Sequence, residues 1–168
     1  HSTYRPVAVY ASDVNGDGIT ELPRAVLMAG YKDTSSSDAV YMLDWYAYGI
    51  GKVPTKVATT YQNISDAWSL LIDQKWHDRI TAIKVSDGGL SYVEFFEYRK
   101  NKMSIPLFNI YCATGSNREY YAERTDLIQL GQTTQAIYFA KLTNEGEQSE
   151  LALTGDEIKA RFCLLYTS

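Results

Sequence analysis

Four oxygen-bearing side chains recur at alternate positions in the segment SDVNGDGITELP near the start of the chain. A hard cation such as Ca²⁺ takes six to eight oxygen ligands, and alternate residues of a tightly curved loop converge on one point. The spacing therefore predicts a structural calcium site. If Asp13 is position 1 of the loop, Ile19 is position 7, and its side chain is expected to point into the core as an anchor. The candidate ligands are Asp13, Asn15, Asp17, Ile19 (through its backbone carbonyl) and Glu21.

A second interpretation of this loop needs no metal. Asn15-Gly16 and Asp17-Gly18 are favoured hairpin dipeptides, so the segment can also be an exposed acidic turn. That interpretation explains the glycines, but it does not explain why oxygen-bearing residues continue at the same spacing to Glu21. A weak calcium site, with a Kd of about 10⁻⁴–10⁻³ M as in extracellular modules, favours a location outside the cell.

The loop departs from the EF-hand pattern and is closer to another one. An EF-hand needs a bidentate glutamate at position 12, where this chain has Arg24. The segment instead resembles the calcium loops of FG-GAP and VCBS repeats, which occur in integrin-type propellers and bacterial surface proteins. This resemblance covers roughly residues 5–48 and implies bound calcium that holds a β-hairpin, with partner recognition made elsewhere. The matching residues are Asp13, Asn15, Gly16, Asp17, Gly18, Glu21 and Leu22.

The whole chain is predicted to be mainly β, with an α+β second half. Runs of β-forming residues separated by turn signals predict a blade-like four-stranded meander within residues 1–62. Its strands are expected over residues 4–11, 22–29, 39–48 and 53–61. The calcium-loop motif has no second copy, so the chain cannot close a propeller by itself.

Residues 63–168 are predicted to form a separate α+β domain, an antiparallel sheet that carries one or two helices and packs with the meander. A helix is expected over residues 117–124. A capping box at Thr154 and Glu157 predicts a last helix that runs through Phe162 and turns Ile158, Phe162 and Leu165 toward the sheet. The strands are expected over residues 67–72, 80–85, 90–98, 106–113 and 134–142.

Composition excludes several classes of protein. Sixteen basic and 20 acidic residues, with no basic cluster, argue against a nucleic-acid partner. No apolar run approaches the roughly 20 residues that span a bilayer, so the chain is not expected to cross a membrane. Two cysteines, Cys112 and Cys163, do not make a disulfide scaffold, and a bridge between them is disfavoured. Because the chain starts at His1 without methionine, we expect a processed form or an excised piece of a longer protein.

Aromatic residues give the second candidate site. Trp45, Tyr46 and Tyr48 could present flat rings to a glycan or a peptide, although strands also use aromatic residues for cross-strand packing. A catalytic centre is not expected. His77 is a lone histidine, and Glu94 and Glu97 are predicted on opposite faces of one strand. Glu119 and Glu123 share a helix face, which is more typical of a solvated surface.

A second resemblance concerns the later part of the chain. The strand that ends near Trp76 and the Leu-Phe-Asn-Ile segment over residues 107–110 are similar to the C-terminal region of uncharacterised Gram-positive lipoproteins and surface proteins. Together these observations predict a non-catalytic, extracellular, calcium-stabilised module of a bacterial surface protein, lipid-anchored in its full-length form if that protein is a lipoprotein. The alternative is an accessory or sensing domain of a larger secreted enzyme.

Overall fold

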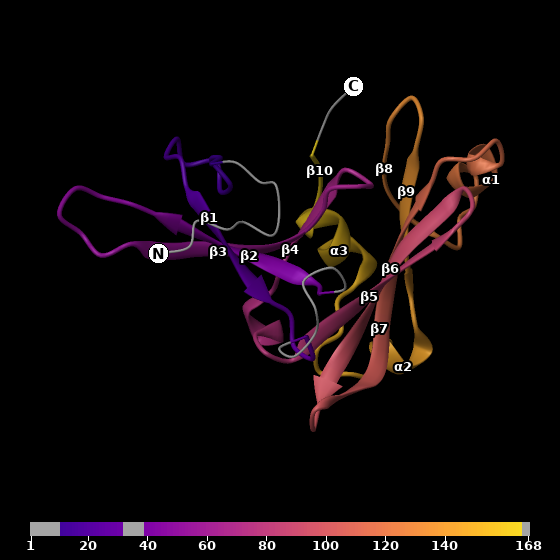
Figure 1. Ribbon diagram of the computed structural model, residues 1–168. Helices are drawn as coiled ribbons and strands as arrows, with labels where there is room; N and C mark the ends of the chain where they lie inside the picture. Colours follow the sequence, from indigo (N-terminus) through magenta and orange to yellow (C-terminus); the bar gives the residue numbers. More distant parts are fainter. Residues whose placement is uncertain (1–10, 32–38, 166–168) are drawn as a thin grey trace.

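The computed structural model describes residues 11–31 and 39–165, which form two antiparallel sheets of five strands each (Figure 1). The strand order of the first sheet is β1-β2-β3-β4-β10, so four strands that follow one another in sequence also pair in space. The end of the described chain adds the fifth strand beside β4. The strands are β1 (Leu22–Leu27), β2 (Tyr41–Ala47), β3 (Thr55–Asn63), β4 (Trp68–Leu71) and β10 (Phe162–Leu164).

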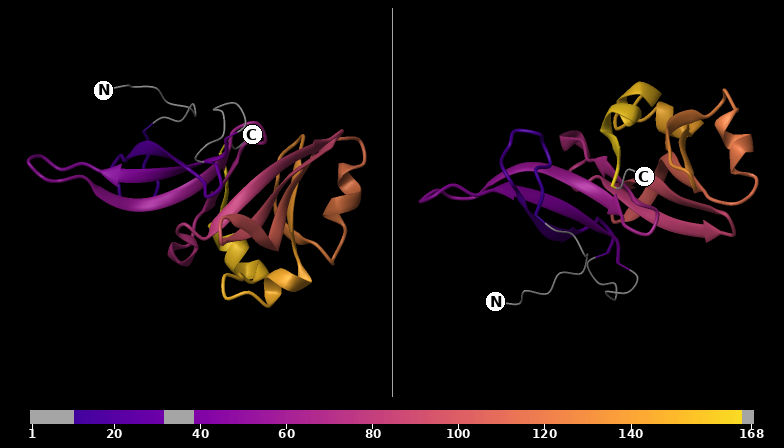
Figure 2. Two further views of the ribbon diagram at one scale, coloured as in Figure 1. Left: turned by 60° about the horizontal axis from the view of Figure 1, so that its bottom comes forward. Right: turned by 90° about the horizontal axis from the view of Figure 1, so that it is seen from above.

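The second sheet has the order β5-β6-β7-β9-β8 and is also antiparallel throughout. Its strands are β5 (Ile80–Asp87), β6 (Leu90–Arg99), β7 (Lys102–Ala113), β8 (Ile128–Gln132) and β9 (Ile137–Leu142). Three short α-helices accompany it, α1 (Arg118–Ala122), α2 (Asn144–Glu147) and α3 (Gly155–Arg161), and a 3₁₀ turn, η1 (Gln74–Trp76), connects the two sheets. Figure 2 shows the sheets packed at an angle, with α3 against strands of both.

One hydrophobic core joins the two sheets. The largest fully buried side chains include Trp68 and Trp76, together with Phe95 and Phe108, whose rings stack with centroids 4.9 Å apart. Tyr61 from the first sheet meets Phe95 from the second edge to face at 5.6 Å. Burial of such aromatic side chains is the dominant favourable term in folding. The shared core means that neither sheet buries its inner face without the other.

The predicted domain boundary between residues 62 and 63 is therefore wrong. It falls within β3, and residues 60–63 pair with residues 68–71 across the β3–β4 hairpin. The sequence changes character there because the chain turns, not because a domain ends. Polar contacts also cross between the sheets: Tyr138 on β9 donates its hydroxyl to the carbonyl of Asp66 at 2.6 Å, and Tyr31 donates to the carbonyl of Ala82 at 2.6 Å.

Most of the predicted elements are confirmed, and several differ from the prediction at their ends. The strand predicted over residues 4–11 lies almost entirely outside the described residues. The last helix has the predicted capping box at Thr154 and Glu157, and Ile158 is fully buried. That helix ends at Arg161, however, so Phe162 and Leu165 do not continue it; β10 begins at Phe162, whose ring stacks on Trp68 at 5.8 Å.

Besides β10 and the turn η1, strand β8 and helix α2 were not expected from the sequence. Strand β8 carries Gly131 beside a register irregularity in its pairing with β9, which breaks the alternation that marks a strand. Helix α2 is a single turn capped by Thr143, whose hydroxyl accepts the amide of Gly146 at 2.8 Å. A side chain at Gly146 would meet the carbonyl oxygen of Leu107 at 2.3 Å, so this helix packs directly on the backbone of β7.

The hydroxyl of Tyr138 tests the coupling between the sheets. Tyr138 is buried, and Tyr138→Phe leaves the carbonyl of Asp66 without this donor, so we expect the free energy of unfolding to fall by about 1–2 kcal/mol. Urea unfolding followed by circular dichroism measures it. The matched control is Tyr48→Phe, at an exposed tyrosine. Equal stability of the two variants would contradict the coupling.

Candidate metal centre

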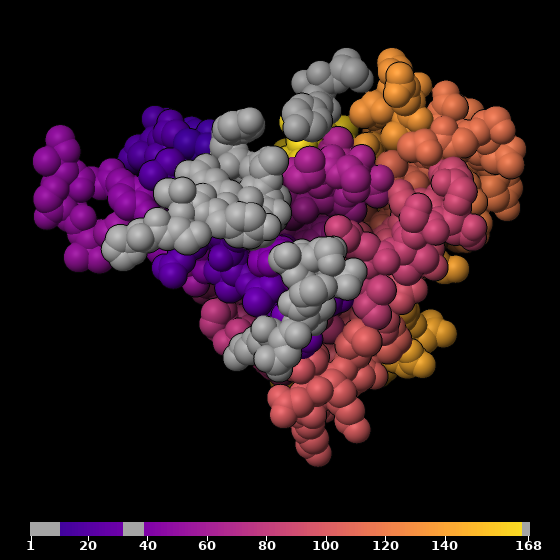
Figure 3. Space-filling view, in the orientation of Figure 1, coloured from indigo at the N-terminus to yellow at the C-terminus, as the bar shows by residue number. Residues whose placement is uncertain are grey.

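A pair of backbone hydrogen bonds closes the loop at residues 13–20. The amide of Ser12 donates to the carbonyl of Glu21 at 3.1 Å, and the amide of Glu21 donates to the carbonyl of Ser12 at 2.9 Å, as in an antiparallel bridge. The loop turns back through Gly16 and Gly18, which have φ angles of 75° and 84°. Glycine adopts these left-handed values without the strain that a side chain introduces. In Figure 3 the loop lies on the surface, among the indigo atoms.

The carboxylate of Asp13 organises the interior of the loop. Its Oδ1 accepts the amides of Gly16 at 2.8 Å and Asp17 at 3.1 Å, and its Oδ2 accepts the amide of Gly18 at 2.8 Å. Asn15 folds over the following peptide unit, because its Oδ1 accepts the amide of Asp17 at 3.1 Å. The loop amides thus point inward at side-chain oxygens, and this arrangement holds those oxygens close together.

Three carboxylates meet in this loop. One carboxylate oxygen from each of Asp13, Asp17 and Glu21 lies within 4.8 Å of the other two. Asp13 and Asp17 are exposed, whereas Glu21 is 0% exposed. Carboxylates at this separation repel one another unless a cation or a proton neutralises them.

The buried carboxylate of Glu21 has one unsatisfied oxygen. Its Oε2 accepts the amide of Val14 at 2.9 Å, whereas its Oε1 is buried and has no hydrogen-bond partner. Burying a charged oxygen without a partner costs several kcal/mol, and native proteins satisfy the great majority of such atoms. Of the buried side-chain oxygens in the described part of the chain, this is the one left without a partner.

The residues present fit a hard cation. All the side-chain donors are carboxylate or amide oxygens, the ligand type that Ca²⁺ and Mg²⁺ prefer, and a cation beside Glu21 would satisfy its free oxygen. The structure brings together the carboxylates of Asp13, Asp17 and Glu21 and places Asn15 beside them, its Nδ2 donating to Asp17 at 3.2 Å. A cation held here would cross-link the loop to the start of β1.

The predicted anchoring role of the Ile19 side chain is wrong. Ile19 is 51% exposed, so it does not enter the core, and its amide donates to Oδ1 of Asp17 at 2.8 Å. The anchor of the loop is Glu21, which the sequence marked as a ligand but not as a buried residue. An acidic residue next to an edge strand is usually exposed, so no signal in the sequence distinguishes a buried Glu21 from an exposed one.

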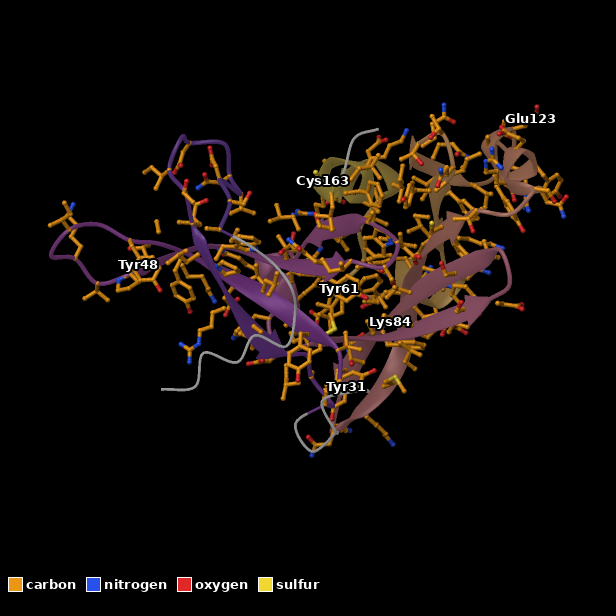
Figure 4. The ribbon with its side chains drawn as sticks, turned by 45° about the horizontal axis from the view of Figure 1, so that its top comes forward. Tyr31, Tyr48, Tyr61, Lys84, Glu123 and Cys163 are labelled. Carbon is orange, nitrogen blue, oxygen red and sulfur yellow. The ribbon has the colours of Figure 1, made fainter. Side chains whose placement is uncertain are left out.

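The predicted aromatic platform is not present on β2. Trp45 is 1% exposed, and its indole Nε1 donates to the hydroxyl of Thr60 at 2.8 Å. Tyr46 lies on the opposite face of the strand and is partly buried. Tyr48 is 55% exposed and lies beyond the end of β2, far from the core (Figure 4). The three rings therefore do not form one exposed row, and recognition of a glycan or a peptide stays a prediction without a site on this strand.

The other titratable residues considered as catalytic candidates are either exposed or paired with neighbouring side chains. His77 is exposed, and its Nε2 lies 3.3 Å from the carboxylate of Asp78. Glu97 is buried, where it pairs with Arg99 and accepts the hydroxyl of Ser149 at 3.1 Å. Glu119 and Glu123 are exposed, and Glu119 lies 3.7 Å from the guanidinium of Arg118. None of the helices in the described part of the chain is long and apolar enough to span a bilayer.

Searches of family models, of curated proteins and of solved structures give no match to this chain. The resemblance of the loop to FG-GAP and VCBS repeats, and that of the later segment to Gram-positive lipoproteins, remain predictions. Inferences about function therefore depend on the geometry of the loop.

Gly18 tests the conformation of the loop. Open space surrounds the position that a Cβ would take, so Gly18→Ala introduces backbone strain without a clash. We expect the free energy of unfolding to fall by about 1 kcal/mol or more, measured in urea without added metal. Gly115→Ala is the control, because its new methyl group would make an ordinary 3.6 Å contact and its φ lies outside the left-handed region. A neutral Gly18→Ala would contradict the described turn.

The two cysteines are free and differ in reactivity. Burial raises the pKa of the Cys112 thiol to about 11, whereas Cys163 is exposed. Because the thiolate is the reactive form, we expect a disulfide reagent at pH 8 to modify one thiol of the native protein and both in urea. The variant Cys163→Ser should show no rapid reaction in its native state. Rapid modification of that variant would contradict the burial of Cys112.

Proposed function

We propose that the loop is a structural site for Ca²⁺, held by the carboxylates of Asp13, Asp17 and Glu21 with Asn15 beside them. The observation that carries the proposal is the buried Oε1 of Glu21, which has no partner, within a cluster of three carboxylate oxygens. A divalent cation neutralises the repulsion among the carboxylates and replaces the missing hydrogen bond of Glu21. Oxygen-only ligands on an irregular loop favour Ca²⁺, which accepts varied coordination geometry, over Mg²⁺, which demands near-ideal octahedral geometry.

In this proposal the cation acts on stability and not in a reaction. It holds the loop against the start of β1, the edge strand of the first sheet among the described residues. The protein would then be a non-catalytic module of a secreted or surface-attached bacterial protein, where free calcium reaches the millimolar concentrations that such a weak site needs. This assignment is supported by the motif and its geometry alone, and the accessory domain of a secreted enzyme is the alternative context for the same module.

A thermal melt with calcium and with chelator tests the proposal. A ligand that binds only the native state stabilises it by RT ln(1 + [L]/Kd), so calcium at about 10–100 times Kd contributes roughly 1.4–2.7 kcal/mol. For a chain of this length we expect Tm to rise by about 3–10 °C. Calcium should raise Tm more than the same concentration of magnesium.

Two variants give this experiment its controls. Glu21→Gln keeps the shape of the side chain but removes the buried charge, so we expect its Tm to be insensitive to calcium and chelator. Glu123→Gln changes an exposed carboxylate at the far end of the molecule (Figure 4) and should keep the full calcium response. If wild type and both variants melt identically with calcium and with chelator, the loop is only an acidic turn.

A further inference from the structure

We propose that the loop modifies itself at Asn15, through attack of the Gly16 backbone nitrogen on the Asn15 side-chain amide. The chain has six asparagines, and only Asn15 is followed by glycine. Asn15 is exposed, Gly16 presents no side chain, and open space surrounds the position that a Cβ at Gly16 would take. The approach of the backbone nitrogen to the side-chain carbon is therefore not obstructed at the following residue.

The hydrogen bonds of the loop engage both reacting groups. Because Oδ1 of Asn15 accepts the amide of Asp17 at 3.1 Å, the side chain folds over the peptide unit that contains the Gly16 nitrogen. That nitrogen donates its hydrogen to Oδ1 of Asp13 at 2.8 Å, which is within the reach required of a general base. The leaving amide nitrogen of Asn15 donates to Oδ2 of Asp17 at 3.2 Å.

The reaction is an intramolecular substitution followed by hydrolysis. The Gly16 nitrogen forms a bond to Cγ of Asn15 and passes its proton to the carboxylate of Asp13. The bond from Cγ to Nδ2 then breaks, and the amide nitrogen takes up a proton and leaves as ammonia. Water opens the five-membered imide at either carbonyl, which gives aspartate or isoaspartate at position 15. Nothing is oxidised or reduced, and water is the only co-reactant.

The two products should change the calcium affinity of the loop in opposite directions. This part of the inference rests on the proposed calcium site. Aspartate adds a fourth carboxylate beside Asp13, Asp17 and Glu21 and should bind calcium more tightly. Isoaspartate inserts a methylene into the main chain and shortens the side chain, so it disrupts the spacing from Asp13 to Asp17 and should abolish binding. Calcium bound to Asp13 would occupy the general base, so it should slow the modification.

Peptide mapping by mass spectrometry of the folded, metal-free protein tests the inference. At neutral pH and physiological temperature, we expect residue 15 to gain the mass that accompanies replacement of NH₂ by OH. Enzymatic methylation of isoaspartate identifies the second product. The five other asparagines of the chain are internal controls, and Asn101 is the closest match, since it is exposed and lies in a turn. Conversion at residue 15 no faster than at Asn101 would overturn the inference.

Two variants separate the steps. Gly16→Ala should slow the conversion because a side chain then shields the nitrogen, and Asp13→Asn should slow it by roughly tenfold or more because the base is lost. An unchanged rate in Asp13→Asn would overturn the role of Asp13. If residue 15 converts equally fast with calcium and with chelator, and Tm is also unchanged, the calcium proposal fails and the modification stands. If Tm depends on calcium but residue 15 does not convert, the modification fails and the calcium proposal stands.

Discussion

The burial of a carboxylate at Glu21 is the constraint on which the organisation of the loop depends. The backbone of Glu21 pairs with Ser12 to close the loop, one carboxylate oxygen holds the amide of Val14, and the other faces no donor. Burial of such an atom is unfavourable unless a cation or a proton neutralises it. The neighbouring carboxylates of Asp13 and Asp17 make a cation the simplest solution, because each additional negative charge makes an uncompensated oxygen less favourable.

The rest of the molecule gives this loop a rigid base and does not need it for its core. The core between the sheets is closed by Trp68, Trp76 and the ring stack of Phe95 on Phe108. Neither cysteine is bridged, so packing and hydrogen bonds supply the stability of the described chain. Among the described residues, the loop continues into β1 at the edge of the first sheet, so a metal cross-link there would act locally.

The sequence predicted the elements whose signals are local. The capping box at Thr154 and the strands over residues 80–85 and 90–98 follow from short-range patterns, and all are present. What failed depended on contacts far along the chain. The hydrogen bond from Tyr138 to Asp66 spans 72 positions, and β10 pairs with β4 across a still longer stretch of sequence. Neither contact leaves a local pattern in the sequence. For this reason one shared core was mistaken for two domains.

The candidate site shows the same division. Alternate spacing identified Asp13, Asn15, Asp17 and Glu21, and the structure brings the three carboxylates together as the spacing predicts. The sequence does not indicate that Ile19 is exposed and Glu21 is buried, because the burial of each side chain depends on how the loop lies over the sheet. Trp45 failed as a surface ring for a related reason: its hydrogen bond to Thr60 holds it inside the molecule.

Anomalous scattering from a crystal grown in millimolar calcium tests the metal site most directly. We expect one strong peak inside the loop, about 2.3–2.6 Å from oxygens of Asp13, Asp17 and Glu21, with Oε1 of Glu21 among the ligands. A well-ordered loop without that peak, and with Oε1 of Glu21 bonded to water or to a protein donor instead, would contradict the site.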